Sequence, residues 1–207
     1  GRPANVRSKL WDLTLDARMQ KEPAWVAARA ALDEVVEELR EVESTEAKDH
    51  AASRKLKEAR GELRAARRHL QKVEATCVSN ILSNAQIIVT TCIGAGSEEL
   101  ISFMREEDMH FSTVLIDEAA QCTEAAIFPA LAFGCERLIL VGDQNQLPPV
   151  VLSSEAAERG MGVSLFSRLI AAGLKPSLLA EQYRMHPIIA QFSSESFYGG
   201  RVISRTE

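Results

Sequence analysis

Acidic side chains follow two short aliphatic runs in the middle of the chain. Residues 114–116 (Val-Leu-Ile) are followed by Asp117 and Glu118, and residues 138–141 (Leu-Ile-Leu-Val) are followed by Gly142 and Asp143. An uninterrupted aliphatic run is typical of a parallel strand that is buried on both faces. Because ligands of open α/β sheets bind at the carboxyl ends of such strands, we expect Asp117, Glu118 and Asp143 to line a ligand site.

Paired carboxylates at a strand end suit phosphoryl transfer. They can hold Mg²⁺, directly or through water, and can activate a second water. The metal neutralises the phosphates, and a nearby side chain orients the nucleophile. The alternative is that Asp117 and Glu118 merely begin a helix, since acidic residues suit a helix N-terminus. These two residues alone leave both interpretations open.

Two further segments carry uncommon combinations of polar residues. Residues 142–151 read Gly-Asp-Gln-Asn-Gln-Leu-Pro-Pro-Val-Val, a long loop in which the Pro-Pro pair prevents a strand from continuing. Residues 182–187 read Gln-Tyr-Arg-Met-His-Pro. Arg184 offers a planar fork of donors that suits phosphate, and Tyr183 offers a flat face for stacking. The alternative for Arg184 is an ordinary surface ion pair, and we expect His186 to be structural, at the start of a helix.

Together these segments resemble a known family. Residues 117–121, 142–151 and 182–187 are similar to motifs II, III and IV of superfamily 1 helicases, and residues 90–96 are similar to motif Ic. The resemblance is to the up-frameshift and senataxin branch, whose members move on RNA or DNA, and it covers roughly residues 79–202. It implies a RecA-like α/β fold with a parallel sheet, and ATP with Mg²⁺ as cofactors.

The resemblance also implies a role for each matched residue. Asp117 would hold Mg²⁺, and Glu118 would orient or deprotonate the attacking water. Gln146 would contact the γ-phosphate, and Arg184 would reach it across the cleft between two motor domains. The remaining matched positions divide between the nucleotide (Gly142, Asp143, Gln182 and Tyr183, the last stacked on adenine) and the nucleic acid (Thr90, Thr91 and Pro149).

One essential part of an ATPase is missing from the sequence. No Gly-x-x-x-x-Gly-Lys-Ser/Thr stretch occurs, so the chain has neither the phosphate-binding loop nor its lysine. The family places that loop before Gly1 and further motifs after Glu207. We therefore expect an internal fragment that is inactive alone. It would comprise a helical insertion (1–80), the latter part of the first RecA-like domain (81–174) and the start of the second (175–207).

Apolar residues spaced along one side predict two helices in the first eighty residues, and the second of them has heptad spacing. The first runs from Pro23 to about residue 42 and is mostly acidic. The second covers about residues 51–80, with a basic exposed side and an apolar seam (Ala52, Leu56, Ala59, Leu63, Ala66, Leu70, Val73 and Cys77). We expect an antiparallel hairpin at about residues 24–80, with residues 46–50 as its turn, and a possible surface for protein partners. The alternative is that the basic side follows a phosphate backbone.

The rest of the chain predicts alternating strands and helices. Residues 87–91 are β-branched and are followed by Gly94-Ala95-Gly96, which predicts a strand and a turn. Helical patterns cover residues 97–107, 123–133, 164–172 and 188–197, with Gly134 and Gly173 as stops. Lys175-Pro176 is a candidate linker before a strand that begins at Leu178. Residues 1–22 do not distinguish a strand from a helix.

The composition is that of an ordinary globular protein: 207 residues, 26% charged, 46% apolar and a formal net charge of −5. No apolar run is as long as a membrane helix, which predicts no membrane association. The four cysteines form no Cys-x-x-Cys pair, which argues against zinc and for reduced thiols inside the cell, in the cytoplasm or nucleus.

The sequence therefore favours a segment of an ATP-dependent helicase that moves on single-stranded RNA or DNA. Two alternatives stay open: a non-catalytic binding or assembly module that keeps the helicase shape, and the motor of a nuclease. The choice between RNA and DNA is also open, because recognition of a 2′-hydroxyl leaves no short motif.

Overall fold

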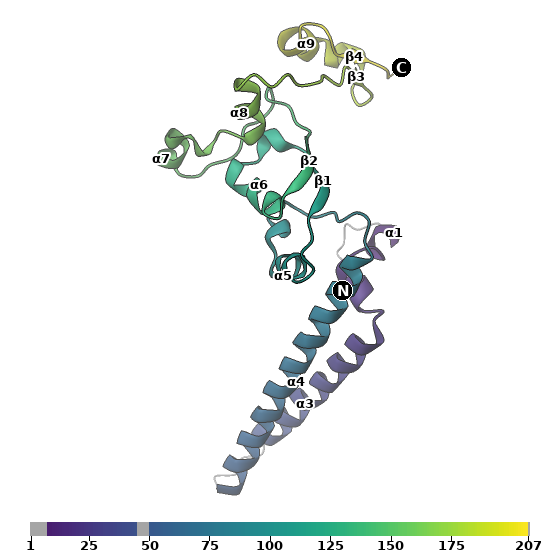
Figure 1. Cartoon of the computed structure of the whole chain (residues 1–207), viewed down its shortest axis with the longest axis vertical. Helices are drawn as coiled ribbons and strands as arrows, with labels where there is room; N and C mark the ends of the chain where they lie inside the picture. The colour runs from purple at the N-terminus through teal and green to yellow at the C-terminus, as the bar shows by residue number, and fades with distance from the viewer. Residues whose placement is uncertain (1–7, 45–49, 207) are drawn as a thin grey trace. The chain divides into compact units, whose positions relative to one another are not determined.

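The computed structural model describes residues 8–44 and 50–206 of the chain (Figure 1). Contacts divide the chain into two compact units. The first comprises Gly1–Thr90 and Ser97–Asp108, and we call it the hairpin unit. The second comprises Thr91–Gly96 and Met109–Glu207, and we call it the sheet unit.

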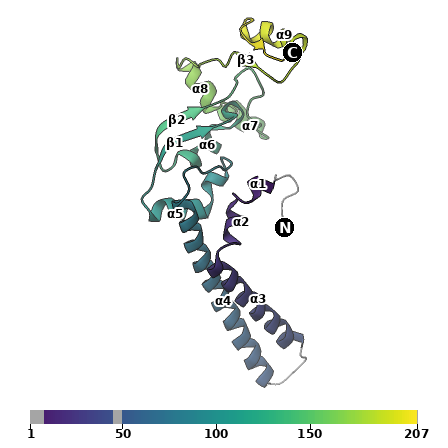
Figure 2. The same ribbon diagram turned by 90° about the vertical axis from the view of Figure 1, so that its right-hand side faces the viewer.

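Two long helices dominate the hairpin unit, as the apolar seam predicts. Helix α3 spans Pro23–Ser44 and α4 spans His50–Ser83, and they lie side by side in both views (Figures 1 and 2). Their core is built from Ala28, Leu32 and Leu70, all buried, and is widened by half-buried neighbours (Trp25, Val36, Leu63, Ala66 and Val73). Residues 46–49 of the predicted turn and the side chain of Ala52 lie outside the described residues, while residue 50, which was predicted to close the turn, begins α4. Apolar burial therefore holds the two helices together.

The smaller helices of this unit pack near the end of α4. Residues 8–22, which the sequence left undecided, form α1 (Ser8–Trp11) and α2 (Leu15–Met19). Helix α5 spans Glu98–Glu106, and the Ser97 hydroxyl caps it by accepting a hydrogen bond from Leu100 N at 3.3 Å. The predicted helix at residues 97–107 is thus confirmed.

The sheet unit contains a parallel pair of strands. Strand β1 spans Phe111–Ile116 and β2 spans Cys135–Leu140, with Ile116 opposite Leu140. The crossover consists of the short 3₁₀ helix η2 (Ala119–Gln121) and helix α6 (Glu124–Leu131). Another 3₁₀ turn, η1, spans Gly94–Gly96. The two strands that precede the candidate carboxylates are therefore direct neighbours, in the parallel orientation that was predicted.

Only one face of this strand pair is covered. Val114, Ile116 and Leu140 belong to a core that also includes Ile127 of α6 and Phe166 of α8 (Leu165–Ala171). On the other face Leu115 remains 61% exposed. The prediction of strands buried on both faces is thus wrong for the described residues. The physical reason is that helices and turns of this unit pack against one side of the pair alone.

Two further strand predictions need correction. Residues 87–91 form no strand, and Ile87 and Val89 are 81% and 91% exposed, because no described strand pairs with them. The strand predicted from Leu178 is shorter and begins later. It is β3 (Glu181–Gln182), which pairs in parallel with β4 (Ile203–Ser204). A β-branched or aliphatic run becomes a strand only where a partner supplies the backbone hydrogen bonds.

The remaining α-helices begin at capping residues. Helix α8 spans Leu165–Ala171, capped by Ser164, and Gly173 after it has a φ of 100°. Helix α9 spans Pro187–Tyr198 and is capped by His186, which confirms the structural role predicted for that side chain. Between β2 and α8 lie α7 (Ser154–Ala156) and the short π-helical segment η3 (Ala157–Met161).

Candidate nucleotide site

The two candidate carboxylates of β1 lie at the end of the strand, where the chain turns sharply. Ala119 N donates to Val141 O at 2.8 Å, and Val141 N donates to Ile116 O at 2.9 Å. Backbone hydrogen bonds between the two segments therefore continue past the ends of β1 and β2. Asp117 and Glu118 lie between these two bonds and are both exposed. The residues after β1 and β2 therefore meet at one edge of the pair.

Glu118 adopts a left-handed backbone conformation, with φ 53° and ψ 36°. This conformation costs a residue with a side chain about 1–2 kcal/mol. Asp117 Oδ1 accepts the Glu118 N–H at 3.0 Å, and Glu118 Oε2 accepts from Gln121 Nε2 at 3.0 Å. Backbone strain of this kind gathers at functional sites.

Gly142 allows the backbone segments that follow β1 and β2 to approach each other closely. A Cβ at this position would lie 2.9 Å from Ala120 N and 3.2 Å from Ala119 N. Ala119 and Ala120 are themselves buried. Gly142 thus lets the loop that contains Asp143 lie against the turn that contains Asp117 and Glu118.

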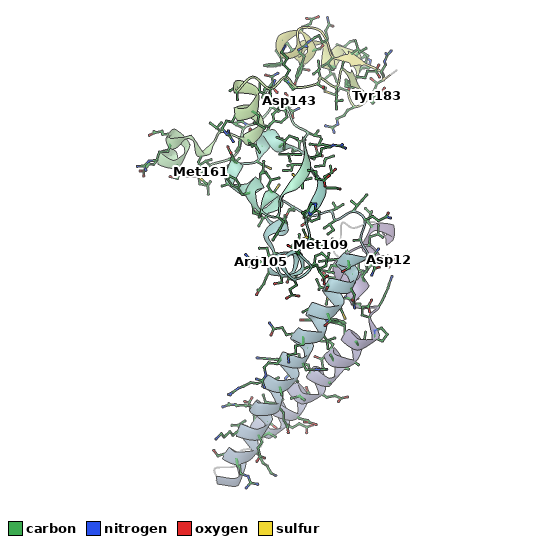
Figure 3. All side chains as sticks on the ribbon, viewed as in Figure 1. Asp12, Arg105, Met109, Asp143, Met161 and Tyr183 are labelled. Carbon is green, nitrogen blue, oxygen red and sulfur yellow. The ribbon has the colours of Figure 1, made fainter. Side chains whose placement is uncertain are left out.

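Asp143 accepts three hydrogen bonds, and Figure 3 labels it in the sheet unit. Its Oδ1 accepts from Asn145 N at 3.0 Å, and its Oδ2 accepts from Gln146 Nε2 at 2.9 Å and from Tyr198 Oη at 2.5 Å. Burial by itself raises the pKa of Asp143, but these three donors outweigh it and hold the pKa below its ordinary value. Asp143 is therefore ionised at neutral pH.

The segment at residues 182–187 is organised by the Gln182 amide. Its Oε1 accepts from Arg184 N at 2.9 Å and from Met185 N at 2.8 Å, while its Nε2 donates to Met185 O at 2.7 Å. These bonds give Gln182 a structural role, and its contact with nucleotide stays a prediction. Arg184 is exposed, and no partner of its guanidinium is recorded among the described residues.

Tyr183 is 68% exposed, and its hydroxyl donates to Glu181 Oε2 at 2.6 Å. This hydrogen bond raises the pKa of Tyr183. The ring face remains accessible for stacking. No contact of Tyr183 or Arg184 with Asp117, Glu118 or Gln146 is recorded in the described part of the chain, so their meeting around a nucleotide stays a prediction.

The candidate nucleic-acid residues have different surroundings. Thr90 is exposed, whereas the Thr91 hydroxyl accepts the Gly94 N–H at 2.9 Å and caps η1. Pro149 is buried, so its predicted contact with a strand would require part of its ring to become exposed. The functions of all three residues remain predictions.

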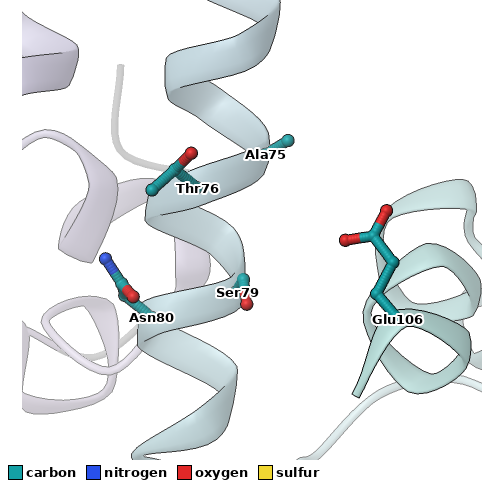
Figure 4. A pocket seen from close by; sticks show the side chains of 5 residues that line it. All are labelled: Ala75, Thr76, Ser79, Asn80 and Glu106. Carbon is teal, nitrogen blue, oxygen red and sulfur yellow. The ribbon is translucent and has the colours of Figure 1, made fainter. Parts of the chain in front are cut away.

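A shallow pocket elsewhere makes a poor alternative to this site. It encloses about 200 Å³ between α4 and α5 of the hairpin unit and is lined by Ala75, Thr76, Ser79, Asn80 and Glu106 (Figure 4). Its one charged lining residue is acidic, whereas phosphates require cations or N–H donors. We therefore place the candidate nucleotide site at the edge formed by the residues after β1 and β2.

The donor set at this edge fits Mg²⁺ with a nucleotide. Mg²⁺ is typically bound by one or two carboxylates together with water and phosphate oxygens. Asp117 offers an exposed carboxylate, and the described residues contain no group of three or more His, Cys, Asp or Glu side chains that could hold a metal by themselves. The site could therefore share a metal with a phosphate ligand.

Comparison with known proteins agrees with the motifs. Two family models, both described as AAA domain, match residues 3–154 and 161–207. The chain belongs to the superfamily 1 helicases of the up-frameshift type. It is 36% identical over 164 residues to a regulator of nonsense transcripts 1 homolog of Arabidopsis thaliana, which covers 79% of this chain and 13% of the relative.

Two further relatives of this helicase segment carry different descriptions. The ATP-dependent helicase NAM7 of Saccharomyces cerevisiae is 42% identical over 148 residues, covering 70% of this chain and 14% of the relative. The 5′-3′ DNA helicase ZGRF1 of Mus musculus is 40% identical over 126 residues, covering 60% of this chain and 6% of the relative. The chain thus spans a small part of the length of each relative.

Tyr198 and Asn145 are site residues that the sequence did not reveal. Tyr198 marked only the end of a helical pattern, and Asn145 only a polar loop position. Their contacts join residues more than fifty positions apart, so no local spacing indicates them. Among the described residues, no helix is both long and apolar enough to cross a membrane.

Proposed function

We propose that this chain is part of an ATP-dependent helicase that moves along single-stranded nucleic acid and hydrolyses Mg-ATP between two RecA-like domains. The observation that carries the proposal is the common edge at which Asp117, Glu118, Asp143 and Gln146 follow two adjacent parallel strands. Relatives described as ATP-dependent helicases support it.

The residues of this chain divide the work of hydrolysis. Asp117 holds Mg²⁺, which when bound neutralises charge on the phosphates. Glu118 orients the attacking water and accepts its proton. Gln146 and Arg184 contact the γ-phosphate from the first and second motor domains, and Tyr183 stacks on the base. Gly142 supports this arrangement through the close approach that it permits.

The domain arrangement is also a proposal. Residues 1–80 form a helical insertion, residues 81–174 belong to the first motor domain, and residues 175–207 begin the second. The exposed face of β1, with Leu115 61% exposed, supports a larger sheet in the full-length protein. The phosphate-binding loop lies in another part of that protein, so the 207 residues alone do not hydrolyse ATP.

The strand is RNA or DNA, since the relatives include both a regulator of nonsense transcripts and a DNA helicase. Thr90, Thr91 and, after local exposure, Pro149 contact its backbone. We place the protein inside the cell, where its nucleic-acid and ATP partners are found, and α3 with α4 offers a surface for protein partners.

The Glu118→Gln variant of the full-length protein tests the function. Nucleotide binding should persist because the metal ligand Asp117 remains, while nucleic-acid-stimulated turnover should fall by about 10²-fold or more, in line with loss of a catalytic base. Glu136→Gln, an exposed acid on β2, is the matched control and should turn over normally. Loss of nucleotide binding in the Glu118 variant would show that the role given to Glu118 is wrong.

A non-catalytic module makes the opposite prediction. Its full-length protein would bind nucleic acid but show no turnover in the wild type, and Glu118→Gln would change nothing. The unobstructed acids and the accessible Arg184 favour the motor over this alternative.

A further inference from the structure

The motif III loop (residues 142–151) is bonded directly to the end of α9. Tyr198 Oη donates to Asp143 Oδ2 at 2.5 Å, and Asn145 Nδ2 donates to Phe197 O at 3.3 Å. Two neighbouring residues of α9 thus contact two nearby residues of the loop. We assign these segments to different motor domains, so the contacts lie where the two domains would communicate.

Asp143 transmits this contact to the phosphate-sensing residue. The oxygen that accepts from Tyr198, Oδ2, also accepts from Gln146 Nε2 at 2.9 Å. The other oxygen is occupied by Asn145 N at 3.0 Å. Removing the Tyr198 hydroxyl therefore takes away one of the two donors to Oδ2, so the Asp143 carboxylate that accepts from Gln146 is held less firmly.

The protonation states of Tyr198 and Asp143 favour the hydrogen bond between them. The hydrogen bond to Asp143 raises the pKa of Tyr198, while donors to Asp143 hold its own pKa below its ordinary value despite the opposing effect of burial. At neutral pH a neutral phenol therefore donates to a charged carboxylate. Hydrogen bonds to charged groups are stronger than those between neutral groups.

The same helix begins next to Arg184. The Gln182 amide fixes the backbone of residues 184 and 185, and the His186 side chain then caps α9. Twelve residues of α9 separate this cap from the far end, a length of about 18 Å at 1.5 Å per residue. A helix of this length is a stiff connection between Arg184 and Tyr198.

We propose that Tyr198 is a positioning residue that uses Asp143 to set the orientation of the Gln146 side chain. Through this bond, α9 links the position of Arg184 to that of Gln146, so that both γ-phosphate contacts form together. The inference rests on the proposed ATPase function. It assigns Tyr198 no contact with the nucleotide.

Tyr198→Phe in the full-length protein is the direct test, because it removes the donor and keeps the ring. Nucleic-acid-stimulated kcat should fall about 10- to 150-fold, as expected for one hydrogen bond to a charged group, while the KM for ATP changes little. Affinity for ADP with aluminium fluoride, which mimics the transferred phosphate, should fall by a similar factor, and affinity for ADP alone should not.

Two variants separate positioning from simple loss of stability. Ser194→Ala also removes a hydroxyl of α9, one that donates to Val202 O at 2.7 Å and has no recorded bond to the motif III loop. It should leave kcat and analogue affinity near the wild-type values. Asn145→Ala removes the second contact from an exposed side chain and should lower kcat in the same direction as Tyr198→Phe even if the latter folds poorly.

The outcomes are distinguishable. Wild-type kcat in both Tyr198→Phe and Asn145→Ala would overturn the positioning role while leaving the ATPase intact. An equal loss in Ser194→Ala would also overturn it, because stability of α9 would then explain the effect. Absence of turnover in the wild type would instead refute the proposed function on which the inference rests.

Discussion

Gly142→Ala is the substitution whose cost can be worked out most directly from the structure. The new Cβ would lie 2.9 Å from Ala120 N, 3.2 Å from Ala119 N and 3.3 Å from Ala120 Cβ. The first distance is shorter than real Cβ atoms show, and two of the three neighbours are backbone atoms, which cannot rotate away. Ala119 is fully buried, and its backbone N–H donates to Val141 O. The clash can therefore be relieved only if the backbone segments after β1 and β2 move apart. Overpacking of this kind costs about 1–3 kcal/mol.

The assay must report on the sheet unit by itself. Both tryptophans, Trp11 and Trp25, lie in the hairpin unit and do not sense this site. The readout is therefore hydrogen exchange of the Ala119 and Val141 amides, which form the hydrogen bonds between the segments after β1 and β2. In Gly142→Ala their protection should fall by about 5- to 150-fold, the equivalent of the stated energy.

The matched control is the same chemical change at Gly61, on the exposed side of α4. A Cβ there meets nothing within 4 Å. Alanine is the better helix former, so Gly61→Ala should stabilise the hairpin unit by about 0.5–1 kcal/mol, read as a higher urea midpoint of tryptophan fluorescence. Unchanged or increased amide protection in Gly142→Ala would refute the close-approach argument.

Arg184→Ala in the full-length protein should lower kcat by about 10³-fold or more while KM changes little, because an arginine that contacts the transferred phosphate acts mainly in the transition state. Arg184→Lys should restore little activity. Near-normal turnover of the alanine variant in steady-state assays would show that Arg184 is a surface residue. Leu63→Asp should abolish the cooperative urea transition of tryptophan fluorescence, because it places a charge beside the α3–α4 core. The double variant Arg64→Glu with Arg67→Glu should leave strand affinity nearly unchanged, and a clear fall with a shallower salt dependence would move the basic side of α4 into the nucleic-acid site.

Local chemistry explains why much of the fold is predictable. Hydroxyl caps such as Ser97 and Ser164 and a glycine stop such as Gly173 act within a few residues, and the helices begin and end beside them. The apolar seam of α4 repeats along one helix, so its packing side could be identified. The two aliphatic runs predicted parallel strands, and β1 and β2 lie at those runs.

The incorrect and missing predictions concern partners distant in the sequence. Residues 87–91 have strand-forming side chains, but pairing depends on a neighbour that their own composition does not specify. Leu115 is as aliphatic as Ile116, yet the covering helices decide which of them is buried. The Asp143–Tyr198 bond joins positions 55 residues apart and has no sequence period. Such features arise from tertiary packing.

The left-handed backbone at Glu118 has a consequence for how this protein responds to selection. The fold bears a cost of about 1–2 kcal/mol at the residue to which we assign the chemistry, and glycine or asparagine would relieve it. Directed evolution that rewards only yield or thermal resistance would therefore favour variants that discard this carboxylate. Such variants would pass every test of folding while being inactive as motors. A campaign to engineer a hardier form of this helicase should therefore hold position 118 fixed.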